Sequence, residues 1–403
     1  MATNIQQPSH VFASAAFFQN PYPLYEQLRA ESPIYKGSAF KYPGWYVTGY
    51  DEAVAIFKNK AVFQNRMPLP ETTKRYERLR KLQQEMMLFK NAYDHKRLRG
   101  LVGKAFHAQM IEEYRPYIEE TVHELLDEIS RKKQMDVVMD FAFPLASLVI
   151  AKILGVPRKD QERFRAWAMC FIQTIDLTRS REDMMQGNKQ AALLGHYFQS
   201  LIAEKRQTPQ DDLISRLIDE EEISDEELLA TCVLLVIAGH ETTVNLISNA
   251  VLSLLQHESQ LLLLKKDPTF IRGAIEETLR FESPTQMVAR VAVSDIEVNG
   301  NHIKEGAQLY VLLGAVNRDP AKFSEPHQFD IARTSNHHLA FGYGSHFCIG
   351  AALARVEAEV AVQVLLEKAD QLELATAEPR WRRLIGFRAL ESCPLYFEHT
   401  ITK

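Results

Sequence analysis

The strongest constraint on the fold is a long apolar segment that begins after Ser224. Ser224 and Glu227 have the spacing of a capping box, which predicts a helix that starts near Asp225. Apolar residues at three- and four-residue spacings then continue to about Gln256, which corresponds to about 30 residues and roughly 45 Å. The first half of this helix is apolar on nearly every side. It must therefore run through the core of a large, mainly helical domain.

The middle of this helix carries an unusual polar segment, residues 238–243, with the sequence AGHETT. A glycine costs about 1 kcal/mol relative to alanine inside a helix, and an unpaired buried carboxylate costs more. Two interpretations follow. In one, Gly239 admits a neighbouring backbone and Glu241 faces solvent. In the other, the segment is a site, where Gly239 opens a groove and the hydroxyl of Thr242 bonds a carbonyl one turn back or a ligand.

Composition excludes several classes of protein. Of the 403 residues, 46% are apolar and 25% charged, which excludes disordered and collagen-like chains. The formal charge of −5 gives no whole-chain affinity for nucleic acid or for an anionic membrane. The best candidate for a membrane span, Leu228 to Ala238, is far shorter than the roughly 20 residues required, so we expect a buried core helix. The N-terminus has no secretory signal pattern, and we expect a cytoplasmic protein.

Helical spacing dominates the rest of the chain, and strand signals are few. Strands are expected near 34–50 and 285–315, including a hairpin at the turn Asn299-Gly300-Asn301. No linker or internal repeat divides the sequence, which favours one domain over 1–403, mainly α with small β-sheets. Further helices are expected at 53–58, 94–106, 111–132, 159–176, 188–205, 268–280 and 351–368.

A second polar concentration is the glycine-rich loop 341–350, which contains Cys348 and is followed at once by a helical pattern. A sulfur just before a helix N-terminus is placed where the dipole and free amides stabilise a thiolate. Such a thiolate suits a soft metal or a nucleophile, whereas a lone cysteine is often a small buried apolar residue. A nucleophile would need a base such as His346, but no third orienting group is evident. A zinc site would need His337, His338, His346 and Cys348 together.

This loop resembles the haem-thiolate loop of the cytochrome P450 family. Phe341, Gly344, Cys348 and Gly350 match each fixed position of the pattern Phe-x-x-Gly-x-x-x-Cys-x-Gly. The resemblance implies a single-domain cytochrome P450 fold in which haem b (heme b, iron protoporphyrin IX) lies between the long helix and the cysteine loop. It also implies that Cys348 is the ligand of the iron.

Three other segments resemble motifs of the same family, in the family's order and spacing. Residues 238–243 are similar to its oxygen-activation motif, and Glu277 and Arg280 match its Glu-x-x-Arg pair. Arg333, in the segment 329–333, corresponds to the arginine that completes an ion-pair triad. The resemblance gives Glu277, Arg280 and Arg333 a structural role beneath the haem, although Glu277 and Arg280 alone could be an ordinary surface pair.

The resemblance also implies roles for other residues. Thr242 would orient dioxygen and Glu241 would supply protons, as an alcohol beside a carboxylate can do. His240 should face away, since its side chain lies about 200° from that of Thr242 around the helix. Residues 91–94 depart from a Pro-Pro pair usual in bacterial members. Haem contacts are expected from Leu88, His95, Arg99, Ala238, Arg290, Phe341, His346 and Gly350, with His95, Arg99, Arg290 and His346 as partners of the propionates.

Within the family, residues 41–50, 86–89, 239–249 and 386–390 resemble the biotin-pathway branch of bacilli. That branch cleaves long fatty-acyl chains presented on acyl carrier protein. The resemblance thus implies a hydroxylase of a fatty acid or fatty-acyl chain. The alternatives are a monooxygenase of a bulkier natural product (macrolide, polyketide or steroid) and a haem-based sensor without turnover. Pocket residues are expected in 67–88 and 171–185 and at Ile237, Met287, Val288, Ile385 and Phe387.

Electrons must come from a separate protein, because the chain contains neither a flavin-binding fingerprint nor a ferredoxin-like cysteine cluster. A ferredoxin or flavodoxin with its NAD(P)H reductase is implied. Lys90, Lys96, Arg97 and Lys104 are the expected docking cations for an acidic carrier. On this hypothesis, charge reversal at Arg97 slows reduction and leaves substrate binding unchanged.

Overall fold

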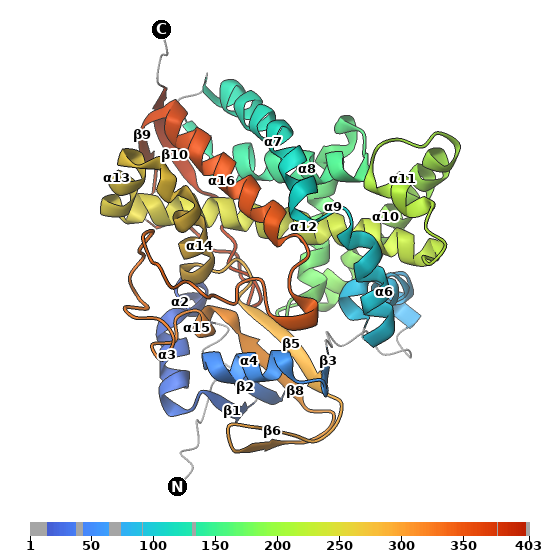
Figure 1. Ribbon diagram of the computed structural model, residues 1–403, viewed down its shortest axis with the longest axis horizontal. Coiled ribbons are helices and arrows are strands. Elements are labelled where there is room, and N and C mark those ends of the chain that lie inside the picture. Colours follow the sequence, from blue (N-terminus) through green and yellow to red (C-terminus); the bar gives the residue numbers. More distant parts are fainter. Residues whose placement is uncertain are drawn as a thin grey trace.

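The long helix is the centre of the molecule. The computed structural model describes residues 14–37, 43–63, 74–90, 92–130, 134–376 and 378–399. The capping box of Ser224 and Glu227 begins α12 (Asp225–Gln256), whose 32 residues are mostly buried. Helices α8 (Phe143–Leu154), α9 (Gln161–Ile175) and α16 (Ala351–Lys368) pack around it, and Figure 1 shows it crossing the middle of the molecule. The sequence prediction of this helix is confirmed.

In Figure 1 the larger sheet lies below α12 together with the N-terminal helices, and helices from the middle and the C-terminal part of the chain lie above α12. Most predicted helices are confirmed within a few residues at each end. Helix α8, the π-helix η4 (Val137–Ala142) before it and several shorter helices were not predicted. The remaining α-helices are α2 (Ala15–Gln19), α3 (Tyr22–Glu31), α4 (Tyr50–Lys58), α5 (Glu77–Glu85), α6 (Ala92–Gly103), α7 (Ala108–Ile129), α10 (Arg181–Gln207), α11 (Leu213–Ile218), α13 (Glu258–Lys266), α14 (Ile271–Phe281) and α15 (Leu313–Val316).

Two described helical segments are long and apolar enough to cross a membrane by length and composition, namely Val137–Leu154 and α12. Within the most apolar window of each, 78% and 83% of the residues are buried inside the protein. A core helix of a globular domain has the same composition, so both segments are explained by their packing against one another.

The main sheet has five strands in the order β1-β2-β8-β5-β3. Strands β2 and β8 pair in parallel and the other neighbours are antiparallel. The predicted hairpin is present, and its turn residues Asn299 and Gly300 both have positive φ, 49° and 71°, as a tight two-residue turn requires. The strands are β1 (Ile34–Gly37), β2 (Gly44–Val47), β3 (Val62–Phe63), β5 (Met287–Ala292), β8 (Gln308–Leu312), the hairpin β6 (Ile296–Val298) and β7 (Asn301–Ile303), and an unpredicted three-stranded sheet of β4 (Gln134–Asp136), β10 (Pro394–His399) and β9 (Ala369–Leu374).

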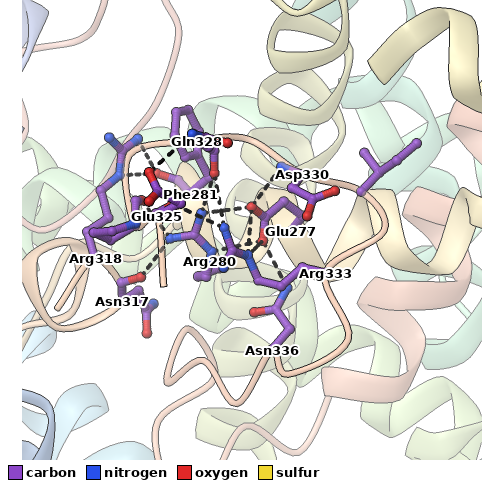
Figure 2. Close-up of polar contacts among 12 residues, drawn as sticks. Glu277, Arg280, Phe281, Asn317, Arg318, Glu325, Gln328, Asp330, Arg333 and Asn336 are labelled. Atoms are coloured by element: carbon purple, nitrogen blue, oxygen red, sulfur yellow. Dashed lines mark hydrogen bonds and ion pairs between the residues drawn. The ribbon is translucent and has the colours of Figure 1, made fainter. Parts of the chain in front are cut away.

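A buried ion-pair network anchors the segment that leads into the cysteine loop (Figure 2). Arg280 donates from Nε and Nη2 to the two carboxylate oxygens of Glu277, at 2.8 and 2.7 Å. Arg333 donates from Nε to the same carboxylate at 3.1 Å. The remaining donors of Arg280 reach carbonyls of Asn317, Pro326 and Gln328. The three motif residues are therefore in direct contact, and they join α14 to the chain between 317 and 336.

Candidate active site

A cavity with a volume of about 270 Å³ lies between α12 and the cysteine loop. Its walls come from segments that are far apart in the sequence: η2 (Met87–Phe89), α6, α8, α9, α12, the start of β5 and the loop 340–350. The predicted contact residues Leu88, Ala238, Phe341 and Gly350 all line it.

Cys348 lies on the wall of this cavity, in a tight loop. Gly342 and Gly344 have φ values of 73° and 77°, which side chains with a Cβ rarely adopt. The turn that they allow lets the amide of Cys348 donate to the carbonyl of Phe341 at 2.9 Å, and α16 begins three residues later. The sulfur thus faces the cavity at a helix N-terminus, as predicted.

The thiolate is less favoured than the sequence predicts. Cys348 is exposed to the cavity, and desolvation by the surrounding protein raises the pKa of its thiol; the amide of Gly350 and the charges of Arg99 and Arg355 oppose this only in part. An iron ion would bind the thiolate directly and supply the missing stabilisation. A zinc site is not formed, because the described residues contain no group of three or more His, Cys, Asp and Glu side chains placed to hold a metal ion.

Four basic residues gather at one end of the cavity, and no described lining residue is a carboxylate. His95 and Arg99 lie one turn apart on α6, Arg290 is on β5, and the ring of His346 lies 3.9 Å from that of His95 between centroids. Burial, together with His95, Arg290 and Arg99, lowers the pKa of His346 to about 3. Burial and Arg99 also lower the pKa of His95.

This basic cluster suits an anionic occupant. Arg99 and Arg290 carry positive charge, the neutral imidazoles of His95 and His346 can donate hydrogen bonds, and no described carboxylate lines the cavity. Haem b has two propionates and an iron that accepts a thiolate. The donor set of His95, Arg99, Arg290 and His346 beside Cys348 therefore fits the cofactor that the sequence resemblance implies.

Thr242 and Gly239 line the cavity from α12. The hydroxyl of Thr242 donates to the carbonyl of Ala238 at 2.7 Å, one turn back, as one sequence interpretation proposes. A Cβ at Gly239 would lie 3.1 Å from Cδ1 of Ile150 on α8, so the glycine admits a side chain rather than a backbone. The interpretation of this segment as a cavity wall is the one that the structure supports.

Glu241 does not face solvent. The interpretation of residues 238–243 in which it does so is therefore wrong. It is 3% exposed and forms an ion pair with Arg382, which lies between β9 and β10. It is also absent from the cavity wall, so a role in proton supply must pass through Thr242 or a movement of the carboxylate. His240 faces away from the cavity as predicted, with its Nε2 2.7 Å from Oγ of Ser147.

Three of the five predicted pocket residues, Ile237, Val288 and Phe387, line the cavity. Met287 and Ile385, also predicted as pocket residues, do not line it. Successive side chains of a strand point to opposite faces, so Met287 turns away from the cavity where Val288 turns toward it. Both misplaced residues pack instead in a core cluster beneath the main sheet.

Other wall residues were foreseen only as regions or not at all. Met87, Ile172 and Ile175 fall within the predicted regions 67–88 and 171–185. Residues 67–73 of the first region lie outside the described part of the chain, as do residues 41, 42 and 91 of the segments compared with the family. Ile150 and Leu313 were missed. Each is an ordinary apolar residue of a core helix, with no sequence signal that separates it from its neighbours.

The predicted docking cations differ in their availability. Arg97 is largely buried and paired through both terminal nitrogens with Glu227 of α12, so its charge reversal would also break this ion pair. Lys90 pairs with Glu85 at 2.7 Å, and Lys104 pairs with Glu220. Lys96 is exposed on α6, the helix that carries His95.

Comparison with known proteins agrees with this geometry. The cytochrome P450 family model matches residues 158–260 and 266–376. The chain is 54% identical over 389 residues to the biotin biosynthesis cytochrome P450 of Bacillus subtilis (strain 168), which covers 96% of this chain and 98% of that protein. It is 36% identical to the polyketide biosynthesis cytochrome P450 PksS of the same organism, over 94% of this chain and 96% of that protein.

Solved structures give the same result. P450BioI in complex with hexadec-9Z-enoic acid ligated acyl carrier protein matches with a TM-score of 0.93 and 54% identity, over 95% of this chain and 100% of that chain. The myxobacterial cytochrome P450 CYP267B1 in complex with myristic acid matches with a TM-score of 0.90 and 34% identity, over 96% of this chain and 99% of that chain.

The predicted fold, mainly α with small sheets in a single domain, is confirmed by these matches. The family's cofactor is the one that the basic cluster and Cys348 fit. The chain belongs to the cytochrome P450 family, and it is a haem-thiolate monooxygenase whose cofactor is haem b.

Proposed function

We propose that this monooxygenase oxidises a long fatty-acyl chain that is presented on acyl carrier protein. One observation carries the proposal. Away from the basic cluster, the side chains on the cavity wall are aliphatic or aromatic except for Cys348 and three threonines, Thr242, Thr243 and Thr285. An alkyl chain fits such a wall, but a carboxylate buried there would have no cation to pair with. The carboxyl end therefore stays outside this apolar wall, where a thioester to a carrier can be accommodated.

The relatives support the same substrate class. The 54% identical structure is of a complex with a fatty-acyl chain on acyl carrier protein, and the 34% identical structure is of a complex with myristic acid. The 54% identical curated relative is named for biotin biosynthesis.

The residues of this chain have distinct tasks in the proposal. When bound, haem supplies the activation of dioxygen that inserts one oxygen atom into a C–H bond. Cys348 holds the iron, and His95, Arg99, Arg290 and His346 hold the propionates. Thr242 presents its hydroxyl at the wall near the reacting carbon, and Glu241 supplies protons to that hydroxyl from behind the helix.

Electron supply and location complete the proposal. A ferredoxin or flavodoxin with its NAD(P)H reductase delivers electrons at the face formed by α6 and the cysteine loop, and the enzyme works in the cytoplasm. In support of this face, α6 touches the loop directly through His95 and His346, and Lys96 is exposed beside them.

The proposal is tested by optical titration of the ferric holoenzyme with palmitic acid, with palmitoyl acyl carrier protein and with unacylated carrier. We expect a saturable low-to-high-spin shift with both acyl ligands, at a lower concentration for the carrier-bound chain, and none with the unacylated carrier. No shift with either acyl ligand, together with a shift produced by a steroid or macrolide, would replace the acyl substrate with a bulkier natural product.

A further inference from the structure

Asp176 connects two walls of the cavity that are distant in the sequence. It directly follows α9, and its carboxylate contacts the turn 383–386 before β10. We propose that Asp176 is a positioning residue that determines specificity: it fixes the distance between Ile175 and Phe387 and so restricts the cavity to slender ligands. The inference rests on the proposed function only in the choice of an alkyl chain as the natural slender ligand.

The carboxylate is buried and fully engaged by neutral donors. Asp176 is 2% exposed. Its Oδ2 accepts from the amide of Gly386 at 2.7 Å, and its Oδ1 accepts from the amide of Ile385 at 3.3 Å. Oδ1 also accepts from the amide and the hydroxyl of Thr178, each at 2.8 Å. Hydrogen bonds to an ionised acceptor are roughly twice as strong as bonds between neutral groups. The contact is thus a strong one for a link between two loops.

The local sequence is shaped for this contact. A Cβ at position 386 would lie 3.1 Å from Oδ2 of Asp176, so Gly386 allows the carboxylate to approach the backbone closely. The amide of Asp176 itself donates to the carbonyl of Ile172 at 3.1 Å, which ends α9 in a defined direction. Both partners of the contact are therefore held in place by their own chain.

Each partner is adjacent to a wall residue. Ile175 precedes Asp176, Phe387 follows Gly386, and both side chains line the cavity. The opposite side of the turn is held by backbone bonds from Gln286 to Gly386 and from Arg388 to Pro284, each at 2.9 Å. These bonds tie the turn to the start of β5 but not to α9. Two side chains link the turn to the end of α9: Asp176, through the amides of Ile385 and Gly386, and Thr178, whose hydroxyl lies 3.3 Å from the carbonyl oxygen of Arg383. Because Thr178 is itself held by the carboxylate of Asp176, removal of that carboxylate weakens both links.

Removal of the carboxylate should let the two walls separate, because two amides of the turn would exchange it for water. A wider cavity accepts bulky ligands more easily and holds a slender chain less firmly. Ligands small enough to bind at the iron without touching either wall should be unaffected. We therefore expect the affinity for bulky ligands relative to small ligands to change, rather than the affinity for all ligands.

The chain offers a matched control in Asp136. Its Oδ1 accepts from the amides of Val138 and Cys393, both at 2.9 Å, so it also joins a helical segment to the C-terminal part of the chain. None of Asp136, Val138 and Cys393 lines the cavity. Asp136→Ala removes a similar contact, but it leaves the walls formed by Ile175 and Phe387 unchanged.

The test is optical titration of the ferric holoenzymes with imidazole and with the bulky azole clotrimazole. For Asp176→Ala we expect an imidazole Kd within about twofold of wild type and a clotrimazole Kd lowered by about tenfold, the size of effect that one charge-assisted hydrogen bond can have. Asp176→Asn keeps one acceptor oxygen, so its clotrimazole Kd should lie between those of wild type and Asp176→Ala. It carries the test if the alanine variant fails to fold or to retain haem.

The ratio of the clotrimazole Kd to the imidazole Kd of each protein decides the outcome. The inference is overturned if this ratio in the Asp176 variants equals that of wild type, or if Asp136→Ala changes it equally. The azole ratio does not depend on the natural substrate. A failure of wild-type enzyme to respond to palmitic acid or palmitoyl acyl carrier protein would instead overturn the proposed function.

Discussion

Glu241 and Arg382 form an ion pair that ties the middle of α12 to the segment between β9 and β10. The carboxylate is almost fully buried and accepts from Nη1 of Arg382, whose Nη2 is buried with no hydrogen-bond partner among the described residues. Because Thr242 is the next residue, the pair places a charged carboxylate directly behind the cavity wall. The side chain proposed to supply protons is thus held in a fixed position by a residue from the C-terminal part of the chain.

Loss of Arg382 should destabilise the protein strongly. Arg382→Gln leaves the carboxylate of Glu241 buried without its cation, which costs about 3–5 kcal/mol. The double variant Glu241→Gln with Arg382→Gln removes both charges and should recover most of that loss. Guanidinium unfolding of the four proteins measures the coupling. Equal destabilisation by the single and double variants would show that the charges are not coupled and that Arg382 acts by packing alone.

The sequence predicted the parts of the site that depend on local patterns. The capping box at Ser224, the glycines around Cys348 and the polar segment at Thr242 are each visible in a few neighbouring residues, and each lies where it was expected. The Glu277–Arg280–Arg333 network was identified by resemblance, and its geometry in Figure 2 follows the motif.

Contacts between distant segments could not be predicted in the same way. Arg382 as the partner of Glu241 and Asp176 as the partner of Gly386 join residues more than 100 positions apart, and no spacing in the sequence indicates either. Met287 and Val288 were both assigned to the pocket because the register of β5 was unknown. A shift of one residue along a strand reverses every side chain.

Arg99 should be required for haem retention. The Arg99→Leu variant removes one cation from the basic cluster, and we expect haem to be lost to excess apomyoglobin about tenfold faster, as for the loss of one charge-assisted hydrogen bond. Lys96→Ala, an exposed change on the same helix, is the control. Equal rates in wild type and Arg99→Leu would contradict the assignment of Arg99 to a propionate.

Glu276 should make the free energy of unfolding depend on pH. Burial raises the pKa of this carboxyl, but hydrogen bonds from His338 and Arg355 outweigh burial and hold the pKa at about 2. An unfolded glutamate titrates near 4.3. Because the folded pKa is the lower one, the stabilisation is fully present above about pH 4.3 and is lost as the pH falls toward 2.

The predicted contribution of Glu276 is roughly 2 kcal/mol at neutral pH, after allowance for its partial exposure. Urea unfolding of wild type and of Glu276→Gln between pH 3 and pH 7 measures it. The difference in unfolding free energy should shrink as the pH falls below about 4. A difference that is constant over this range would mean that the carboxyl is not held ionised by its partners.

Lys96, rather than Arg97, should influence electron delivery. Lys96 is exposed on α6, next to the contact of His95 with His346 in the cysteine loop. Charge reversal by Lys96→Glu should slow reduction by an acidic ferredoxin about threefold to tenfold at low salt, and the effect should fade at high salt. Lys159→Glu makes the same charge change at an exposed position before α9. The rate of reduction of both variants, measured by stopped flow, tests whether the carrier docks at α6. Equal slowing in both would indicate an effect of net charge rather than docking at α6.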